Sequence, residues 1–351
     1  MIKDHHLQTG AFLMSAVDTK PSKDINQEAI VKAADNAATR IQEAREAISA
    51  VIYGQETVVE RAMTTILSGG HGLLVGVPGL AKTLLVETMG TVLGLDAGRV
   101  QFTPDLMPSD ILGSEVMEQD EKGKRSFRFL KGPIFTQLLM ADEINRASPR
   151  TQSALLQAMQ EYHVTVAGKR YDLDEPFHVL ATQNPLEQEG TYPLPEAQLD
   201  RFLMQIDVLY PELDAERRIL LETTGAETAV AKPILNAKEL REFQLLVRQM
   251  PVGESVIEAI LELVRSARPD ADTTDEMTKH IAWGPGPRAS QALMLTVRAR
   301  ALLQGRLAPS IDDVLALAEP VLQHRMALSF SARADGITIR DVIASLKGKI
   351  G

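Results

Sequence analysis

The chain has 351 residues, which is long enough for two domains, and its 44% hydrophobic and 24% charged residues are ordinary for a globular protein. It contains no cysteine, which excludes a disulfide framework, a thiolate metal site and a cysteine nucleophile. The net charge is −10, and residues 233–351 are nearly neutral, so the first 232 residues carry the negative charge. An acidic main domain is a poor general binder of nucleic-acid backbones.

The N-terminal residues 1–25 are expected to be flexible. They lack the continuous apolar core of a signal peptide, and no apolar run in the chain approaches the roughly 20 residues of a membrane helix. We therefore expect a cytoplasmic protein with no membrane insertion.

Residues 26–210 read as an α/β core with a parallel sheet. One or two helices are expected between 26 and 50, and another follows Tyr53-Gly54-Gln55 as far as Leu67. Apolar strands then alternate with helices, a pattern typical of a parallel sheet covered on both faces. The strands are predicted at 72–76, 99–102, 137–142, 178–182 and 205–209, and the helices at 82–93, 148–161 and 196–203.

Two β-hairpins are expected to interrupt this alternation, at 112–134 and 162–173, because alternating residues there flank polar turns. Hairpins inserted in a parallel core usually project from it. Residues 211–232 are expected to form a linker, and 233–351 a helical domain with one short strand at 337–339. Within that domain, Trp283 is expected to be a packing anchor.

The strongest chemical signal is Gly76-Val77-Pro78-Gly79-Leu80-Ala81-Lys82-Thr83. An apolar strand precedes it and a helix follows, which is the order that a phosphate-binding loop requires. Backbone N–H groups attract phosphate oxygens, Lys82 supplies a positive charge, and the Thr83 hydroxyl can bind Mg²⁺. Ala81 stands where a second glycine is usual, and we expect it to be tolerated if its backbone is already helical, with a negative φ. Taken alone, the segment could also be an ordinary strand–turn–helix.

Two further polar groups follow predicted strands. Asp142 and Glu143 end the strand at 137–142 and suit Mg²⁺-assisted hydrolysis, with Asp142 orienting the metal and Glu143 polarising water. Asn184 follows the strand at 178–182 and could reach a terminal phosphate, although Asn before proline is by itself only a turn signal.

The chain closely resembles the MoxR-type AAA+ ATPases of the helix-2-insert branch. The residues that carry the resemblance are 76–83, 142–147 (Asp-Glu-Ile-Asn-Arg-Ala), 151–161, 181–185 and 189–202. In that family alanine is usual at the position of Ala81. The resemblance extends from about Ile41 to Leu346.

The resemblance implies a three-layer αβα core with a helical lid, assembled as a ring that is often a hexamer, with ATP and Mg²⁺ as cofactors. Lys82, Thr83, Asp142 and Glu143 match the phosphate-loop, metal and catalytic residues. Asn184 matches the first sensor, Arg201 the arginine finger that a neighbouring subunit inserts, and Arg288 the second sensor of the lid. Residues 53–55 match the adenine site.

Several roles stay open at this stage. Arg146 is either an interface arginine or a partner of a nearby acid. The hairpins match inserts that face the ring pore, so their basic side chains either touch a substrate or are simply solvated. These basic residues are Lys122, Lys124, Arg125, Arg128, Lys131, Lys169 and Arg170.

The resemblance implies an ATPase that remodels, matures or assembles a partner, with a separate von Willebrand A-domain protein or a client enzyme as the partner. The alternatives are a nucleic-acid-stimulated motor, a magnesium-chelatase-like motor subunit and a switch that binds ATP without hydrolysis. The acidic main domain disfavours the first of these, and intact Asp142, Glu143, Asn184 and Arg201 disfavour the last. The seven histidines are scattered without paired metal spacing, which disfavours Zn²⁺.

Overall fold

The computed structural model describes residues 27–119, 125–187, 190–225, 230–269 and 279–350. The predicted flexible segment 1–25 and most of the predicted turn of the first hairpin lie outside these residues.

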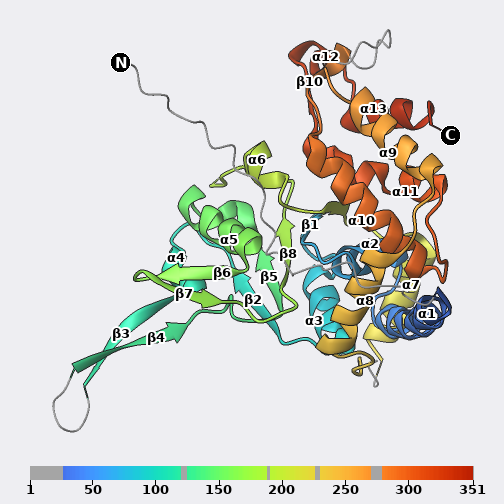
Figure 1. The fold of residues 1–351 in the computed structure, drawn as a ribbon. Helices are drawn as coiled ribbons and strands as arrows, with labels where there is room; N and C mark the ends of the chain where they lie inside the picture. The colour runs from blue at the N-terminus through green and yellow to red at the C-terminus, as the bar shows by residue number, and fades with distance from the viewer. Residues whose placement is uncertain (1–26, 120–124, 188–189, 226–229, 270–278, 351) are drawn as a thin grey trace, which may run out of the picture.

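A five-stranded parallel sheet forms the centre of the core (Figure 1). Its strand order is β2-β5-β8-β1-β9, and neighbouring strands pair in parallel. The strands are β1 (Gly72–Val75), β2 (Ala97–Gln101), β5 (Leu138–Asp142), β8 (His178–Gln183) and β9 (Met204–Asp207). The five predicted strands and the α/β class are therefore confirmed.

Helices cover both faces of the sheet and make the three layers. On one face, α1 (Gln27–Ser49), α2 (Glu56–Leu67) and α3 (Lys82–Leu93) share a hydrophobic core with the C-terminal helices. On the other face, α5 (Pro149–Glu161) and the single-turn helices α4 (Pro108–Leu112) and η1 (Ile144–Arg146) enclose a second core.

Helix α6 is shorter than predicted. It spans Glu196–Leu199, whereas the sequence indicated a helix to residue 203. The carbonyl oxygens of Asp200 and Phe202 instead accept hydrogen bonds from Arg325 of the C-terminal domain. The backbone after Leu199 thus continues in turns, with Phe202 N donating to Leu199 O (3.0 Å), and its carbonyl oxygens bind the C-terminal domain.

The two predicted hairpins are present and project together from the core (Figure 1). They consist of β3 (Gly113–Gln119) with β4 (Arg125–Lys131), and β6 (His163–Val166) with β7 (Lys169–Asp172). The rings of Phe129 and Tyr171 stack with centroids 4.0 Å apart, and Lys169 Nζ lies 3.1 Å from Glu115 Oε1. These contacts join the hairpins into one arm.

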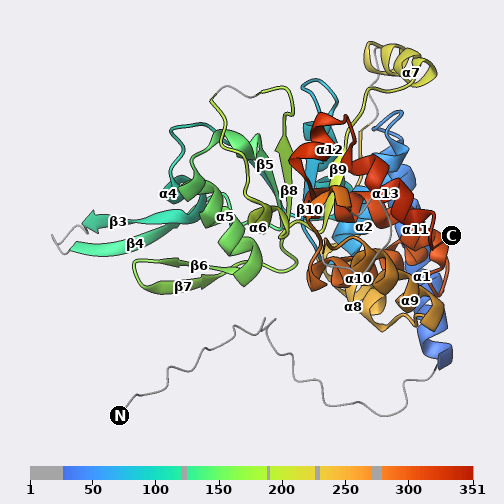
Figure 2. The same ribbon diagram turned by 90° about the horizontal axis from the view of Figure 1, so that it is seen from above.

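The segment expected to be a linker contains a helix. Figure 2 shows α7 (Leu213–Thr223) standing out from the rest of the molecule. Its Arg218 guanidinium lies 4.7 Å from the centroid of the Tyr53 ring. Helix α7 therefore contacts the segment that precedes α2.

The C-terminal domain is helical, as predicted, but its strands lie elsewhere. Thr338 accepts a hydrogen bond from Asp341 N as the cap of α13, so the strand predicted at 337–339 is wrong. Trp283 is 37% exposed and is therefore not a buried anchor. The helices are α8 (Ala237–Gln249), α9 (Glu254–Ser266), α10 (Pro287–Leu303), α11 (Ile311–Leu322), η3 (Gln323–Arg325), α12 (Phe330–Ala334) and α13 (Ile339–Lys347), and β10 (Ile281–Trp283) pairs antiparallel with β11 (Ala327–Leu328).

Within the described residues, no helix has the length and apolar character needed to cross a membrane.

Two buried histidines connect the core to helix α8. His71 Nδ1 accepts from Val179 N (3.0 Å), so its Nε2–H donates to Met159 O (3.1 Å). His178 Nδ1–H donates to Gly70 O (2.8 Å), and its Nε2 accepts from Gln244 of α8 (3.0 Å). These bonds require the neutral ring. Burial lowers the pKa of His71 to about 3 and that of His178 to about 4.

We predict that the protein loses stability as the pH falls from about 6.5 to 4. The unfolded chain binds protons below its ordinary histidine pKa of about 6.5, whereas the folded chain resists protonation, so this stabilisation is complete above that pH. Each histidine should reduce the free energy of unfolding by about 1.4 kcal/mol per pH unit. Urea unfolding between pH 7.5 and 5 measures the slope.

The matched variants are His178→Gln, which should reduce the slope, and His280→Gln outside this pair, which should not. An equal slope in the parent and His178→Gln would contradict this assignment.

Candidate active site

The carboxyl ends of the parallel strands bring the predicted motifs to one edge of the sheet. The loop 76–83, hereafter the phosphate loop, follows β1, Asp142 ends β5, and Asn184 follows β8. β8 lies between the other two strands in the sheet, and Val75 pairs with Gln183 in the β1–β8 register. Gly76 N also donates to Gln183 O (3.1 Å). The three motifs therefore meet at one place.

The start of the phosphate loop leaves no room for a side chain. A Cβ at Gly76 would lie 2.6 Å from Val208 O, so only glycine fits. At Gly79, by contrast, φ is +86° and no atom lies within 4 Å of an added Cβ, so the backbone alone requires glycine. The loop is thus fixed against β9 at one end and open above Gly79.

Lys82 points into the phosphate loop. Its Nζ donates to Gly76 O (2.6 Å) and Val77 O (2.8 Å), which curls the loop around the ammonium group. Burial lowers the pKa of Lys82, and the negative charges of Asp142 and Glu143 oppose that shift. The lysine therefore lies close to both acids.

The backbone conformation of Ala81 differs from the negative φ expected from the sequence. Its φ is 55° and its ψ is 23°, in the left-handed region, where it directly precedes α3. This conformation costs an L-residue with a Cβ about 1–2 kcal/mol. The turn from the loop into α3 therefore requires a left-handed residue, and alanine occupies the position under strain.

Asp142 is nearly buried and is held from two neighbouring strands. Thr182 of β8 donates its hydroxyl to Asp142 Oδ1 (2.6 Å). Arg99 of β2 donates through Nη2 (2.6 Å) and Nε (3.2 Å) to Oδ2. These bonds fix the direction in which the carboxylate points.

Glu143 is held in a similar way. Its backbone φ is 54°, and its N–H donates to the hydroxyl of Thr182 (2.8 Å). Its Oε2 accepts from Gln101 (2.7 Å) and from Arg146 (2.8 Å). Within this protomer Arg146 is therefore the partner of a nearby acid, which is one of its two predicted roles.

Asn184 is 6% exposed, and its Oδ1 accepts from Leu186 N (3.1 Å). The side chain is therefore oriented by the turn that follows β8.

A cavity of about 770 Å³ lies beyond β9, lined on one side by Gly54 and Gln55. Gly54 has φ +69°, and an added Cβ would lie 2.4 Å from the Ala215 side chain, so glycine lets α7 approach. Gln55 Nε2 donates to Leu209 O (2.9 Å). This size falls in the range of small-molecule sites. The C-terminal domain reaches the cavity through Arg340, whose Nη2 lies 2.5 Å from Asp207 Oδ2.

Arg201 and Arg288 lie away from the phosphate loop of their own protomer. Leu203 N donates to His71 O, just before β1 begins, so the segment 200–203 lies at the amino end of β1. Arg201 Nη1 donates to Leu156 O (2.6 Å), and Arg288 Nη1 lies 3.4 Å from Asp200 Oδ2. Neither arginine lines the cavity beside Gly54.

Arg99, Gln101 and Thr182 contact the two acids, although no role is predicted for them from the sequence. The signal was the polar alternation Arg99-Val100-Gln101 in a strand predicted to be apolar, which places Arg99 and Gln101 on the same face. The register of β2 with β5 then sets Gln101 opposite Asp142. Only the strand order shows that these side chains meet the two acids.

The residues fit Mg²⁺ together with phosphate oxygens. Among the described residues, no group of three or more His, Asp or Glu side chains could hold a metal alone. The hydroxyl of Thr83 and the carboxylate of Asp142 are hard oxygen donors of the kind that Mg²⁺ prefers. Mg²⁺ usually takes one or two protein ligands, with substrate phosphates and water completing its shell.

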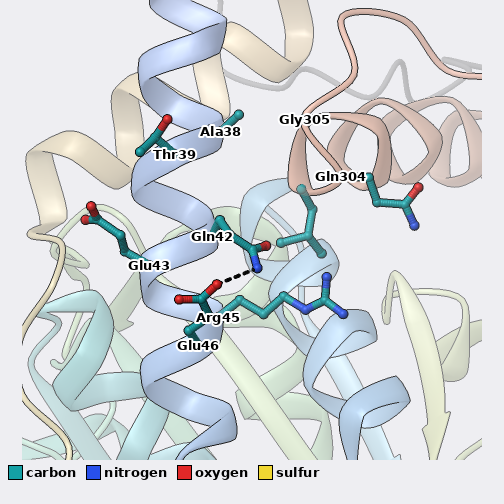
Figure 3. Close-up of a pocket in the computed structure, with 9 residues that line it drawn as sticks. Ala38, Thr39, Gln42, Glu43, Arg45, Glu46, Gln304 and Gly305 are labelled. Carbon is teal, nitrogen blue, oxygen red and sulfur yellow. Dashed lines mark hydrogen bonds between the residues drawn. The ribbon is translucent and has the colours of Figure 1, made fainter.

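A second cavity lies between α1 and the end of α10 (Figure 3). Gln42 Nε2 donates to Glu46 Oε1 within the cavity (3.0 Å), while Gln304 lies across the opening at the end of α10. Other polar side chains of its lining bond to residues outside it, as Gln304 does to Glu60 (3.5 Å). The cavity shares no residue with the motif-bearing edge of the sheet, so it is not part of the candidate active site.

Comparisons with known proteins agree with this geometry. Residues 71–204 match the ATPase family associated with various cellular activities (AAA), and residues 276–346 match the AAA lid domain. The chain is 42% identical to "Chaperone MoxR1" of Mycobacterium tuberculosis over 297 residues, covering 84% of this chain and 78% of the relative. It is 31% identical to "Protein MoxR" of Paracoccus denitrificans, covering 83% and 89%. A crystal structure of a Cytophaga hutchinsonii protein superposes with a TM-score of 0.86 at 37% identity, covering 93% and 99%.

We predict that Ala81→Gly raises the free energy of unfolding. Glycine removes the left-handed penalty of about 1–2 kcal/mol, of which greater freedom of the unfolded chain takes back about 0.4–1 kcal/mol. Denaturant titration should therefore show a gain of about 0.5–1 kcal/mol. The control is Ala154→Gly within α5, which should instead lose about 1 kcal/mol. A loss of stability in Ala81→Gly would contradict the strained conformation.

Proposed function

Because the chain belongs to the MoxR family of AAA+ ATPases, we propose that it hydrolyses ATP with Mg²⁺ and acts as a chaperone-like machine on a partner protein. The observation that carries the proposal is the Thr182 hydroxyl. It bonds both Asp142 and the backbone of Glu143 beside the phosphate loop. A metal-orienting acid and a water-polarising acid are thereby held at fixed positions next to a phosphate site.

The phosphate loop would bind the triphosphate through its backbone N–H groups and the N-terminus of α3. Lys82 would exchange the carbonyl oxygens of Gly76 and Val77 for phosphate oxygens, which are stronger acceptors because they are charged. When bound, Mg²⁺ supplies charge neutralisation at the phosphates, and Thr83 and Asp142 would hold it.

Glu143 would polarise the attacking water as its proton acceptor, and Asn184 would orient the terminal phosphate. Gln101 and Arg146 hold the Glu143 carboxylate in this protomer. The hydrogen bonds limit its rotation, which preorganises it for the reaction.

The nucleoside would occupy the cavity beside Gly54. Tyr53, Gly54 and Gln55 match the family's adenine site. Leu209 lines the cavity, and the preceding Val208 packs against Gly76 of the phosphate loop, which supports placing the nucleoside there. The adenine would thus lie between the start of α2 and the end of β9.

Arg201 would act on the neighbouring subunit. The segment 200–203 lies at the amino end of β1, whereas the phosphate loop follows the carboxyl end of the same strand. The sheet therefore separates Arg201 from the site of its own chain. An always-charged planar guanidinium suits the oxygens of a transferring phosphoryl group. This arrangement favours a ring, a hexamer in our proposal, in which each site is completed by the next subunit.

The partner would be a separate protein, either one with a von Willebrand A domain or a client enzyme. A relative named as a chaperone supports this class of function. The joined hairpin arm projects away from the lid (Figure 1), so it is available to a client on the pore side of a ring. We expect no nucleic-acid partner.

We predict that Glu143→Gln binds ATP as tightly as the parent but hydrolyses it at least about 100-fold more slowly, because the amide cannot accept the proton from water. Phosphate release measures turnover, and fluorescent-nucleotide titration measures binding. Hydrolysis at the parent rate would remove Glu143 from the catalytic role.

We predict that two inactive variants regain ATPase activity when they are mixed. Arg201→Ala keeps an intact site but lacks the finger, whereas Lys82→Ala keeps the finger but loses its site. Fingers are worth roughly 10³–10⁵ in rate, so each variant alone should be nearly inactive, while the mixture regains a substantial part of the parent rate. A mixture no more active than the sum of its components would contradict the action of Arg201 across subunits.

A further inference from the structure

The backbone that carries Arg201 is held by the lid. We call residues 200–203 the finger segment. It lies between α6, which ends at Leu199, and β9, which begins at Met204, and its backbone N–H groups donate to carbonyl oxygens of Glu196, Gln198, Leu199 and His71. Its carbonyl oxygens make the further contacts.

These contacts come from the three consecutive residues of η3 in the lid. Arg325 is 2% exposed, and its Nη2 donates to Phe202 O (2.7 Å) and Asp200 O (3.4 Å). Its Nη1 donates to Leu203 O (3.1 Å), and its Nε to the Asp200 carboxylate (2.8 Å). Carbonyl oxygens on both sides of Arg201 are therefore fixed by one guanidinium.

The two residues before Arg325 extend the same clamp. The buried His324 donates from Nε2 to Phe202 O (3.0 Å), because a carbonyl oxygen can only accept. Gln323 Nε2 donates to Gln205 O at the start of β9 (3.2 Å). A lid element thus covers the finger segment and the strand that follows it.

The Arg201 side chain is held much less firmly than its backbone. Nη1 donates to Leu156 O, while Nε is buried and has no hydrogen-bond partner among the described residues. A buried guanidinium N–H without an acceptor is unfavourable, which leaves the side chain poised to move. An arginine that must reach another subunit requires a backbone that is held in place and a guanidinium that can leave its present contacts.

We infer that Arg325 is the positioning residue for the arginine finger, aiming Arg201 at the neighbouring subunit from within the lid of its own chain. The inference rests on the proposed action of Arg201 across subunits. Burying a guanidinium is costly, and a well-packed apolar side chain would often serve stability equally well. The planar guanidinium of Arg325 meets the carbonyl oxygens of Asp200, Phe202 and Leu203 together, which suits it to fix the position of that backbone. Displacing a reacting group by about 1 Å can cost roughly 100-fold in rate.

The test uses the finger-donating and site-bearing subunits separately. The donor carries Lys82→Ala and the acceptor carries Arg201→Ala. Adding Arg325→Gln to the donor should reduce the ATPase rate of the mixture roughly 100-fold. Adding it to the acceptor, whose finger is already absent, should leave the rate within about twofold.

The matched control is Arg300→Gln on the donor. Arg300 also joins the lid to the core, through Glu60 (2.9 Å), but it does not contact the finger segment. It should leave the rate within about twofold. Thermal unfolding and sizing of each mixture show whether the subunits fold and assemble. If Arg325→Gln does not fold, Asp200→Asn on the donor provides the second variant, because it removes the charge that faces Arg325, and it should reduce the rate at least about tenfold.

Equal losses with Arg325→Gln on either subunit, or no loss on the donor, would overturn the inference and leave a structural role alone. The failure of the unmodified donor and acceptor to restore activity would instead refute the action of Arg201 across subunits.

Discussion

The hydroxyl of Thr182 joins the parallel strands β5 and β8 at their carboxyl ends, where the candidate catalytic residues lie. It donates to Asp142 and accepts from the backbone N–H of Glu143, so a residue of β8 fixes the positions of the two acids at the end of β5. This bond depends on parallel pairing, because only parallel neighbours bring their carboxyl ends to one edge. The phosphate loop after β1 adjoins the same edge on the other side of β8. The sheet order therefore assembles the site before any ligand binds.

The amino ends of the strands lie at the opposite edge of the sheet, where the segment that carries Arg201 is held. The finger segment lies at the amino end of β1, and the lid fixes it through η3. The same lid reaches the cavity at the carboxyl end of β9 through Arg340, which lies beside Asp207. One helical domain therefore contacts both ends of the core. In the proposed ring, the lid would therefore contact both the cavity of its own chain and the segment that carries the finger for the next subunit.

The strands, most helices and the contiguous motifs that meet at one edge of the sheet could be predicted, because each depends on a local pattern. The contacts of Arg99 and Gln101 could not, since they depend on which strand lies beside β5. The shortened α6 depends on a distant donor, Arg325, which a local helical pattern cannot reveal. The φ of Ala81 was predicted wrongly because alanine ordinarily avoids the left-handed region, and the loop overrides that preference.

The central claim is that hydrolysis requires residues from two subunits. Its most direct test measures the ATPase rate per subunit across a dilution series, with the oligomeric state determined in the same samples. The account predicts that the rate per subunit falls with the oligomeric fraction and nearly vanishes for the monomer, which keeps its phosphate loop, Asp142 and Glu143 but lacks a neighbour's Arg201. A rate per subunit that stays constant into the monomeric range would contradict it.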